Sequence, residues 1–310
     1  MSVIQRIKDY RSIDAVNQSL IKEIITGKKW NDEEICYSSA LSCGNLLDLY
    51  ITIPKEEWES MLYINDSISV PGDKAYKAIH SIKDFRLSDV LRDNMSLLES
   101  LDYYSNWTLE KRMDTLIKEG ENYWNHLLVS EGKWIIDKTD YIKVDNAFSN
   151  YTTYIEPLLK EMGELKYQQE VYFNYLNTPC KQLLDIVILQ DEKPVAIVDV
   201  KYTDSINNWK YVAKTLRYDI QAGFANIYAP VPFYFAFCSE NGCKLIKVTE
   251  EDIKVARYGL TMNYPVLYTS TKESDIFTKE ILGIDQAIDI IKGNQIENLN
   301  LFSYDVRKSI

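Results

Sequence analysis

Histidine is scarce in this chain of 310 residues, which contains only His80 and His126. Cysteine is sparse too: there are five, an odd number, at irregular spacings. These shortages argue against a zinc site and against catalysis by a histidine-based triad, and they favour reduced, structural thiols. An enzyme of this composition must therefore work with carboxylates, lysines and tyrosines, with a hard metal ion as a further option.

Long apolar runs are also missing. The longest candidate, residues 229–238, contains two prolines and falls far short of the roughly 18 residues that a membrane span needs. The N-terminal sequence has no apolar core like that of a signal peptide. The sequence also shows no internal repeat and no linker rich in glycine, proline or serine. We therefore expect a cytoplasmic protein without a membrane partner.

Acidic residues exceed basic residues, 46 against 35, which gives a formal net charge of −11. A protein that coats nucleic acid without selectivity is usually basic, so this balance argues against that class. A DNA enzyme with a locally neutral site remains compatible, because residues 181–220 hold as many basic as acidic side chains. A hydrophobic fraction of 46% with 23 tyrosines excludes a disordered chain.

Hydrophobic periodicity predicts a helical first half followed by strands. Helices are expected over residues 17–27, 38–49, 141–163, 206–225 and 276–291. Strands are expected over residues 169–175, 183–189, 195–201, 231–237 and 244–248. This order predicts an α/β (α+β) core whose central mixed β-sheet is flanked by helices. We divide the chain into a mostly helical region, 1–165, that contributes to the active site, and a core domain, 166–310.

Two of the predicted strands, 183–189 and 195–201, form a hairpin that carries the candidate chemistry. If Leu189 faces Val195, then Asp185 lies opposite Asp199, and Lys201 points to the same side. Opposed carboxylates repel each other unless one takes up a proton or both bind a cation. Two carboxylates, a hard cation such as Mg²⁺ and a lysine are the parts needed for metal-assisted phosphodiester hydrolysis. The alternative interpretation is a chance pattern on a half-exposed hairpin.

The same residues resemble a known signature. Asp185 followed by Asp199-Val200-Lys201 resembles the motif of PD-(D/E)xK nucleases, and within that superfamily the exonuclease VIII (RecE-like) exodeoxyribonucleases of phages and prophages. Further matching segments are Cys180-Lys181 before Asp185, Tyr202-Thr203 after Lys201, Tyr218 with Gln221-Ala222, and Gly44 with Asp48. The resemblance spans roughly residues 15 to 290 and is most specific over 180–225.

The chain departs from the family pattern at three positions. The family's histidine near the N-terminus appears as Asp48, which is still a metal-ligand type. The arginine of the Cys-Lys strand is replaced by Leu183. The tyrosine expected four residues after the glutamine is Ala225, and Tyr218 or Tyr228 are the candidates to replace it. These departures leave the central carboxylates and the lysine in place.

The resemblance implies a restriction-endonuclease-like core that binds Mg²⁺, with Mn²⁺ as a possible substitute. The implied metal ligands are Asp185, Asp199, the Val200 carbonyl and Asp48. Lys201 would position the attacking water, and Gln221 would hold that water or the phosphate. Basic and aromatic residues expected to contact DNA are Lys181, Lys210, Lys214, Arg217 and Tyr218.

The implied activity is that of an exodeoxyribonuclease acting on linear double-stranded DNA in the 5′→3′ direction. Its single-stranded tails would serve recombination, in a bacterial cell or a phage-infected host, with a single-strand annealing protein as a partner. A homo-oligomer is also implied, and a closed ring would explain processivity. Two alternatives stay open: a structure-specific or restriction-type endonuclease of the same fold, and a DNA-related binding module without catalytic activity.

Overall fold

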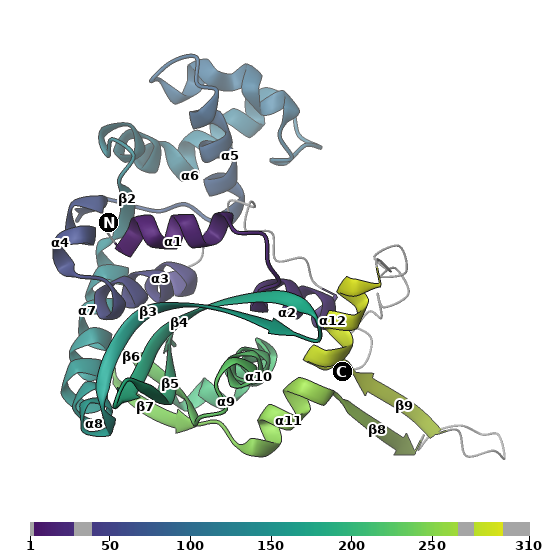
Figure 1. Cartoon of the computed structure of the whole chain (residues 1–310). Coiled ribbons are helices and arrows are strands. Elements are labelled where there is room, and N and C mark those ends of the chain that lie inside the picture. The colour runs from purple at the N-terminus through teal and green to yellow at the C-terminus, as the bar shows by residue number, and fades with distance from the viewer. Residues whose placement is uncertain (1–2, 28–38, 266–275, 294–310) are drawn as a thin grey trace.

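The computed structural model describes residues 3–27, 39–265 and 276–293 (Figure 1). Its α-helices are α1 (Val3–Ser12), α2 (Gln18–Thr26), α3 (Ser39–Thr52), α4 (Lys55–Trp58), α5 (Asp73–Asp84), α6 (Leu109–Val129), α7 (Lys138–Asn150), α8 (Glu156–Met162), α9 (Trp209–Thr215), α10 (Tyr218–Tyr228), α11 (Glu250–Tyr258) and α12 (Ile284–Lys292). Short 3₁₀ segments are η1 (Glu59–Met61), η2 (Leu91–Ser100) and η4 (Ile206–Asn208), and η3 (Tyr151–Ile155) is a π-helical turn.

A five-stranded mixed sheet forms the centre of the fold. Its strands are β3 (Glu164–Tyr175), β4 (Thr178–Gln190), β5 (Lys193–Tyr202), β6 (Phe233–Ser239) and β7 (Gly242–Lys247), which lie side by side in that order. The β5–β6 pair is parallel and the other neighbours are antiparallel. The parallel pair requires a crossover, which α9 and α10 supply. The predicted mixed sheet and α+β class are thus confirmed.

The β4–β5 hairpin has the predicted register at its centre. Ile186 pairs with Val198, and Ile188 pairs with Ala196, as expected. A bulge after Ile188 then places Leu189 opposite Pro194, where Val195 was expected. The strands run further than predicted, so a two-residue turn replaces the expected five-residue connection. Both turn residues have positive φ, as a tight hairpin that follows the strand twist requires.

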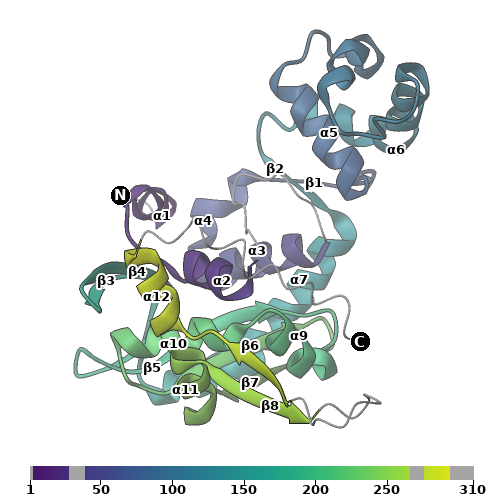
Figure 2. The same cartoon turned by 90° about the vertical axis from the view of Figure 1, so that its right-hand side faces the viewer.

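Both faces of the hairpin are covered. One face packs against α3 and α7 in a core cluster that includes Leu46, Leu47, Val144, Ala147, Ile186, Ile188, Ala196 and Val198. The other packs against α10 in a cluster that includes Val187, Ile197, Ala222, Ala225 and Phe235. Burying one such side chain contributes about 1.5–3 kcal/mol, so these two layers fix the central strands firmly. Figures 1 and 2 show the helices on both sides of the sheet.

The N-terminal segment pairs with β4 through a parallel bridge between Val16 and Cys180. Asn17 caps α2 by accepting a hydrogen bond from the Leu20 amide at 3.0 Å, and Gly27 ends the helix with positive φ. Just before the cap, the Val16 amide donates to the Pro179 carbonyl at 3.0 Å. The Lys181 amide donates back to the Val16 carbonyl at 2.8 Å. The predicted helix over 17–27 is therefore confirmed, and its position relative to the sheet is fixed by backbone hydrogen bonds.

A helical lobe covers residues 62–137 and has a core of its own. The parallel strands β1 (Leu62–Asn65) and β2 (Trp134–Asp137) form its base. Its core includes Ile79, Ile82, Leu116 and Trp124, and it shares no residue with the clusters around the sheet. Both views show α5 and α6 standing apart from the sheet (Figures 1 and 2). The lobe therefore folds around its own apolar contacts.

The helix predicted over 141–163 is present but changes pitch in the middle. It begins as α7, widens into the π turn at Tyr151–Ile155 and continues as α8. Pro157 stands at the start of α8. Because proline has no N–H to donate to the preceding turn, a widened turn accommodates it inside a continuous helix.

Two predictions of regular structure were wrong in part. The helix expected over 206–225 is broken at Arg217, whose φ of 50° places it in the left-handed region between α9 and α10. In the segment 276–291, Ile276–Ile281 forms the strand β9, which pairs with β8 (Leu260–Pro265), and α12 follows. Gly283 lies between β9 and α12. Its backbone is so close to that of Gly259 that any side chain at this position would clash. Among the described residues, no helix has both the length and the apolar character needed to cross a bilayer.

Candidate active site

A cavity of about 1190 Å³ opens beside the ends of β4 and β5 that carry the predicted carboxylates. Its walls come from α1, α2, α3, α9 and α10 together with the two strands. The structure brings most of the predicted site residues to this cavity: Asp48, Lys181, Asp185, Asp199, Val200, Lys201, Tyr218 and Gln221. Lys210, Lys214 and Arg217 are not among its lining residues. Residues from four separate stretches of sequence thus meet in one place.

Asp185 is held across the hairpin by its neighbouring strand. The ladder pairs Ile186 with Val198, so Asp185 and Asp199 follow at the adjacent position. The backbone amide of Val200 donates a hydrogen bond to Asp185 Oδ2 at 2.9 Å. Because this donor belongs to the backbone, it holds one oxygen of the Asp185 carboxylate in a fixed position on β5.

Asp199 is almost fully buried, and the side chains of Gln221, Lys201 and Asp185 lie against it. Gln221, from the first turns of α10, donates its side-chain amide to Asp199 Oδ1. The Lys201 ammonium forms an ion pair with Asp199 Oδ2. The Tyr218 ring lies beside this pair, with its centroid 5.0 Å from Lys201 Nζ. The lysine is thereby held between a carboxylate and the face of an aromatic ring.

Asp48 reaches the site from α3, on the other side of the sheet end. Thr52, one turn further along α3, has its hydroxyl 2.7 Å from the Asp48 carbonyl and 3.3 Å from Asp48 Oδ1. The Gln168 side-chain amide donates to Thr52 Oγ1 at 2.7 Å and lies 3.3 Å from Asp48 Oδ1. An aspartate beside Leu46 and Leu47 needs such partners, since a carboxylate in apolar surroundings is costly.

The three carboxyl groups do not behave as ordinary aspartates. Burial raises the pKa of Asp48 to about 8, and the charges of Asp185 and Asp199 add to the shift while Lys201 opposes it. Burial also raises the pKa of Asp199 to about 7, again opposed by Lys201 and supported by Asp185. The pKa of Asp185 is raised for the same first reason. Burial opposes the charge of Lys201, but the carboxylates of Asp199 and Asp185 outweigh it and raise the pKa of the lysine.

The carboxylate oxygens of the cavity can be compared with the ligands that a divalent metal ion requires. Among the described residues, no three His, Cys, Asp or Glu side chains are gathered closely enough to hold a metal as they stand. Mg²⁺ nevertheless needs few protein ligands, because it is commonly bound through one or two carboxylates and keeps several waters. Asp199 Oδ2 is a buried oxygen for which the described residues supply no hydrogen bond apart from its ion pair with Lys201. The Asp185–Asp199 pair therefore supplies oxygen donors of the type that a hard cation binds.

Lys181 has a different role from the predicted DNA contact. Its side chain is buried, and its ammonium donates to the carbonyls of Tyr10 at 2.8 Å and Arg11 at 3.3 Å, and to that of Ile13. It also lies 4.7 Å from the centroid of the Tyr10 ring. These carbonyls belong to the end of α1, where a cation offsets the negative end of the helix dipole. Lys181 therefore anchors α1 to β4, and its donors are already used within the protein.

The basic residues after β5 are divided between two helices. Lys210 and Lys214 are exposed on α9, and exposed Tyr211 beside them lines the cavity. Arg217 forms an ion pair with Asp219 at 2.8 Å, so its charge is largely engaged within the protein. Lys210 and Lys214 thus give α9 an exposed basic face beside Tyr211, while exposed Arg11 of α1 lines the cavity itself.

Sequence reasoning did not find Gln168 or Lys22. Gln168 has φ 47° within β3, a conformation that costs an ordinary residue about 1–3 kcal/mol. Lys22 lies on α2 with its ammonium 5.8 Å from the Tyr218 centroid, and burial together with the Lys201 charge lowers its pKa to about 8. Neither residue carries a sequence signal, because each meets the site only through the folding of distant segments.

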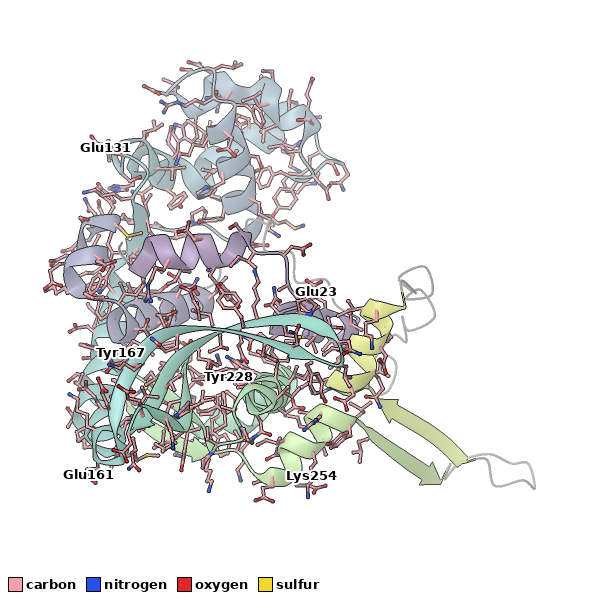
Figure 3. The ribbon with its side chains drawn as sticks, viewed as in Figure 1. Glu23, Glu131, Glu161, Tyr167, Tyr228 and Lys254 are labelled. Carbon is pink, nitrogen blue, oxygen red and sulfur yellow. The ribbon has the colours of Figure 1, made fainter. Side chains whose placement is uncertain are left out.

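The departures from the family pattern can also be located. Leu183, at the position of the family arginine, lines the cavity. Tyr228, labelled in Figure 3, lies at the far end of α10 and packs near Phe173, with ring centroids 5.9 Å apart. Tyr218, at the beginning of α10, lines the cavity. Of the two tyrosines considered as replacements for the one missing at Ala225, Tyr218 is the one at the site.

No protein-family model matches the chain, and a search of curated proteins finds no similar sequence. Among solved structures, the chain is similar to a crystal structure from Eubacterium rectale described as a "Putative exonuclease". The identity is 17% and the TM-score is 0.41, and the match covers 78% of this chain and 75% of that chain. At this level of similarity, a functional conclusion has to rest on the residues of the site.

Proposed function

We propose that this protein is a metal-dependent deoxyribonuclease that hydrolyses phosphodiester bonds in linear double-stranded DNA. The observation that carries the proposal is the meeting of Asp185, Asp199 and Lys201 in one cavity. Like charges so close together are costly in a folded protein, and a divalent cation would stabilise them. A binding module that does not need a cation has no use for two buried, adjacent carboxylates.

The residues have distinct tasks in this proposal. Asp185 and Asp199, with the Val200 carbonyl and Asp48, would hold the metal. A bound divalent metal supplies positive charge for the phosphate and lowers the pKa of an attacking water. Lys201 carries a fixed positive charge that can orient the nucleophile or balance the developing charge of the phosphate. Gln221 holds the Asp199 carboxylate by its amide, and exposed Lys210 and Lys214 attract the DNA backbone to the mouth of the cavity.

We further propose that the enzyme is an exonuclease of 5′→3′ direction that uses Mg²⁺ or Mn²⁺. This finer assignment is supported by the resemblance of the 180–225 segment to the exonuclease VIII family. A ring-shaped homo-oligomer, a role in recombination and a single-strand annealing partner follow from the same resemblance and share its status as proposals.

The test is release of acid-soluble nucleotides from linear duplex DNA at about 5–10 mM Mg²⁺, a range suited to weak carboxylate sites. We expect digestion of the linear DNA while a covalently closed circle stays intact, with loss of activity in chelator and in Lys201→Ala. Lys193→Ala, an exposed lysine at the other end of β5, is the matched control and should remain active. Substrates labelled at the 5′ or the 3′ end then give the direction.

Other outcomes would change the assignment. Cutting of the closed circle would replace the exonuclease by an endonuclease of the same site. Absence of cleavage with any divalent metal, in a folded protein, would overturn the catalytic proposal and favour a DNA-related binding module.

A further inference from the structure

Gln168 interrupts β3 at the level of the candidate metal site. Its neighbours Tyr167 and Gln169 pair with Ile186 and Leu184, which places Gln168 opposite Asp185. Its φ of 47° lies in the left-handed region, and its side chain is only 2% exposed. A glutamine buried in this conformation requires surroundings that hold it there.

What holds it is the polar end of α3. The Gln168 amide nitrogen lies 3.3 Å from Asp48 Oδ1, 3.5 Å from Oδ2 and 2.7 Å from Thr52 Oγ1. It therefore presents its donors to the one carboxylate of the site that comes from α3. Asparagine adopts the left-handed region more readily, but its amide is one methylene shorter.

We infer that Gln168 is a positioning residue for Asp48, whose carboxylate it holds in a set orientation at the proposed metal site. The inference rests on the metal-dependent activity proposed above. Without the amide, the Asp48 carboxylate would lose its donor from β3 and would keep, among the described residues, only the Thr52 hydroxyl, at 3.3 Å from Oδ1. Partners that orient a metal ligand in this way commonly change metal affinity by about 10–100-fold when they are removed.

A purely structural role makes a different prediction. If Gln168 served only to join β3 to α3, its loss would lower the melting temperature and leave the metal affinity unchanged. The distinguishing quantity is therefore the metal concentration at half-maximal thermal stabilisation, which requires no catalysis and no DNA.

The experiment compares the wild type with Gln168→Met, which keeps the length of the side chain and removes its donors. Thermal unfolding is followed while Mn²⁺ or Mg²⁺ is titrated into the metal-free protein. We expect the half-maximal concentration to rise about tenfold in Gln168→Met. Gln169→Met is the matched control on the adjacent residue, whose amide bonds the Tyr167 carbonyl, and it should keep the wild-type value.

A second variant keeps the test decisive if Gln168→Met does not fold. Gln168→Asn suits the left-handed backbone but leaves its amide short of Asp48, so it should fold and show the same rise in metal concentration. Unchanged half-maximal concentrations in the folded variants would overturn the inference and leave the proposed nuclease intact. Absence of any metal-dependent stabilisation in the wild type would instead count against the proposed metal site, and the inference would fall with it.

Discussion

The Val200 amide donates to Asp185 Oδ2 at 2.9 Å, so the backbone of β5 holds a carboxylate of β4. Two substitutions of Asp185 should therefore have different effects on stability and on nuclease activity. Asp185→Asn keeps an oxygen acceptor for the Val200 amide and should fold with near wild-type stability. Because the substitution removes a charged ligand of the proposed metal, nuclease activity should fall by at least about 100-fold. Asp185→Ala removes the acceptor and should lower the free energy of unfolding by about 1–3 kcal/mol. Urea unfolding and the nuclease assay measure the two effects, and equal stabilities of both variants would contradict this account.

Asp48 should make the metal-free protein less stable at alkaline pH. Its pKa rises from 3.8 to about 8 on folding, so between these values the folded state holds a proton that the unfolded state releases. Stability should therefore fall as pH rises through this window. Asp48→Asn cannot ionise and should show a shallower decline of melting temperature between about pH 5.5 and 8.5 in chelator. Parallel curves for the two proteins would show that Asp48 does not carry the effect.

Lys181 should matter for stability because its ammonium bonds carbonyls at the end of α1. Lys181→Met keeps the aliphatic stem and removes the ammonium donor from those carbonyls, so we expect a loss of about 1–3 kcal/mol in the free energy of unfolding. Hydrogen exchange should become faster over residues 3–16. Lys193→Met, at an exposed position, should change neither quantity, and a stable Lys181→Met with an unaltered α1 would refute the anchoring role.

The two exposed lysines of α9 should contribute to DNA affinity and leave stability unchanged. Lys210→Ala and Lys214→Ala should each lower the slope of log K against log salt by about one, because each removes one phosphate contact. Binding is measured in Ca²⁺ or chelator to prevent cleavage. Lys254→Ala, on α11 as labelled in Figure 3, is the control with an exposed lysine outside the cavity. An equal change in all three variants would mean that α9 is not the DNA-facing surface.

His80 should make the helical lobe sensitive to acid. Its Nε2 lies 3.0 Å from the Tyr123 hydroxyl, and burial lowers its pKa from 6.5 to about 4. The unfolded state therefore binds a proton that the folded state refuses, and stability should be lost as pH falls from about 6.5 toward 4. Hydrogen exchange over residues 62–137 should accelerate in that range. His80→Gln should reduce the dependence on pH, and an unchanged pH profile would refute the assignment to His80.

The part of the site that could be predicted from the sequence is local. Asp185, Asp199 and Lys201 lie on one hairpin, so strand alternation and a short turn were enough to bring them together. The bulge after Ile188 did not disturb this prediction, because it lies on the turn side of the correctly paired residues. The apolar character of both strands likewise predicted their central place in the sheet.

The remaining features depend on contacts between distant segments. Lys181 looked like a surface lysine because nothing near it in sequence shows that the end of α1 covers it. Gln168 meets Asp48 across 120 positions and through a left-handed residue that no strand pattern predicts. The strand β9 was mistaken for a helix because residues 276–281 are apolar enough for either structure, and their pairing with β8 decided the outcome.

The hydrogen bonds between residues 10–16 and β4 also impose an order on folding during synthesis. Lys181 and its acceptor in α1 are 171 positions apart, so α1 leaves the ribosome long before its anchor exists. At about 5–20 residues per second, the delay is on the order of ten to thirty seconds. The separate core cluster of the lobe lies within one continuous stretch, residues 63–135, and can form during this time. Helix α1 is thus made well before it is fixed, and until then it is open to chaperones and proteases.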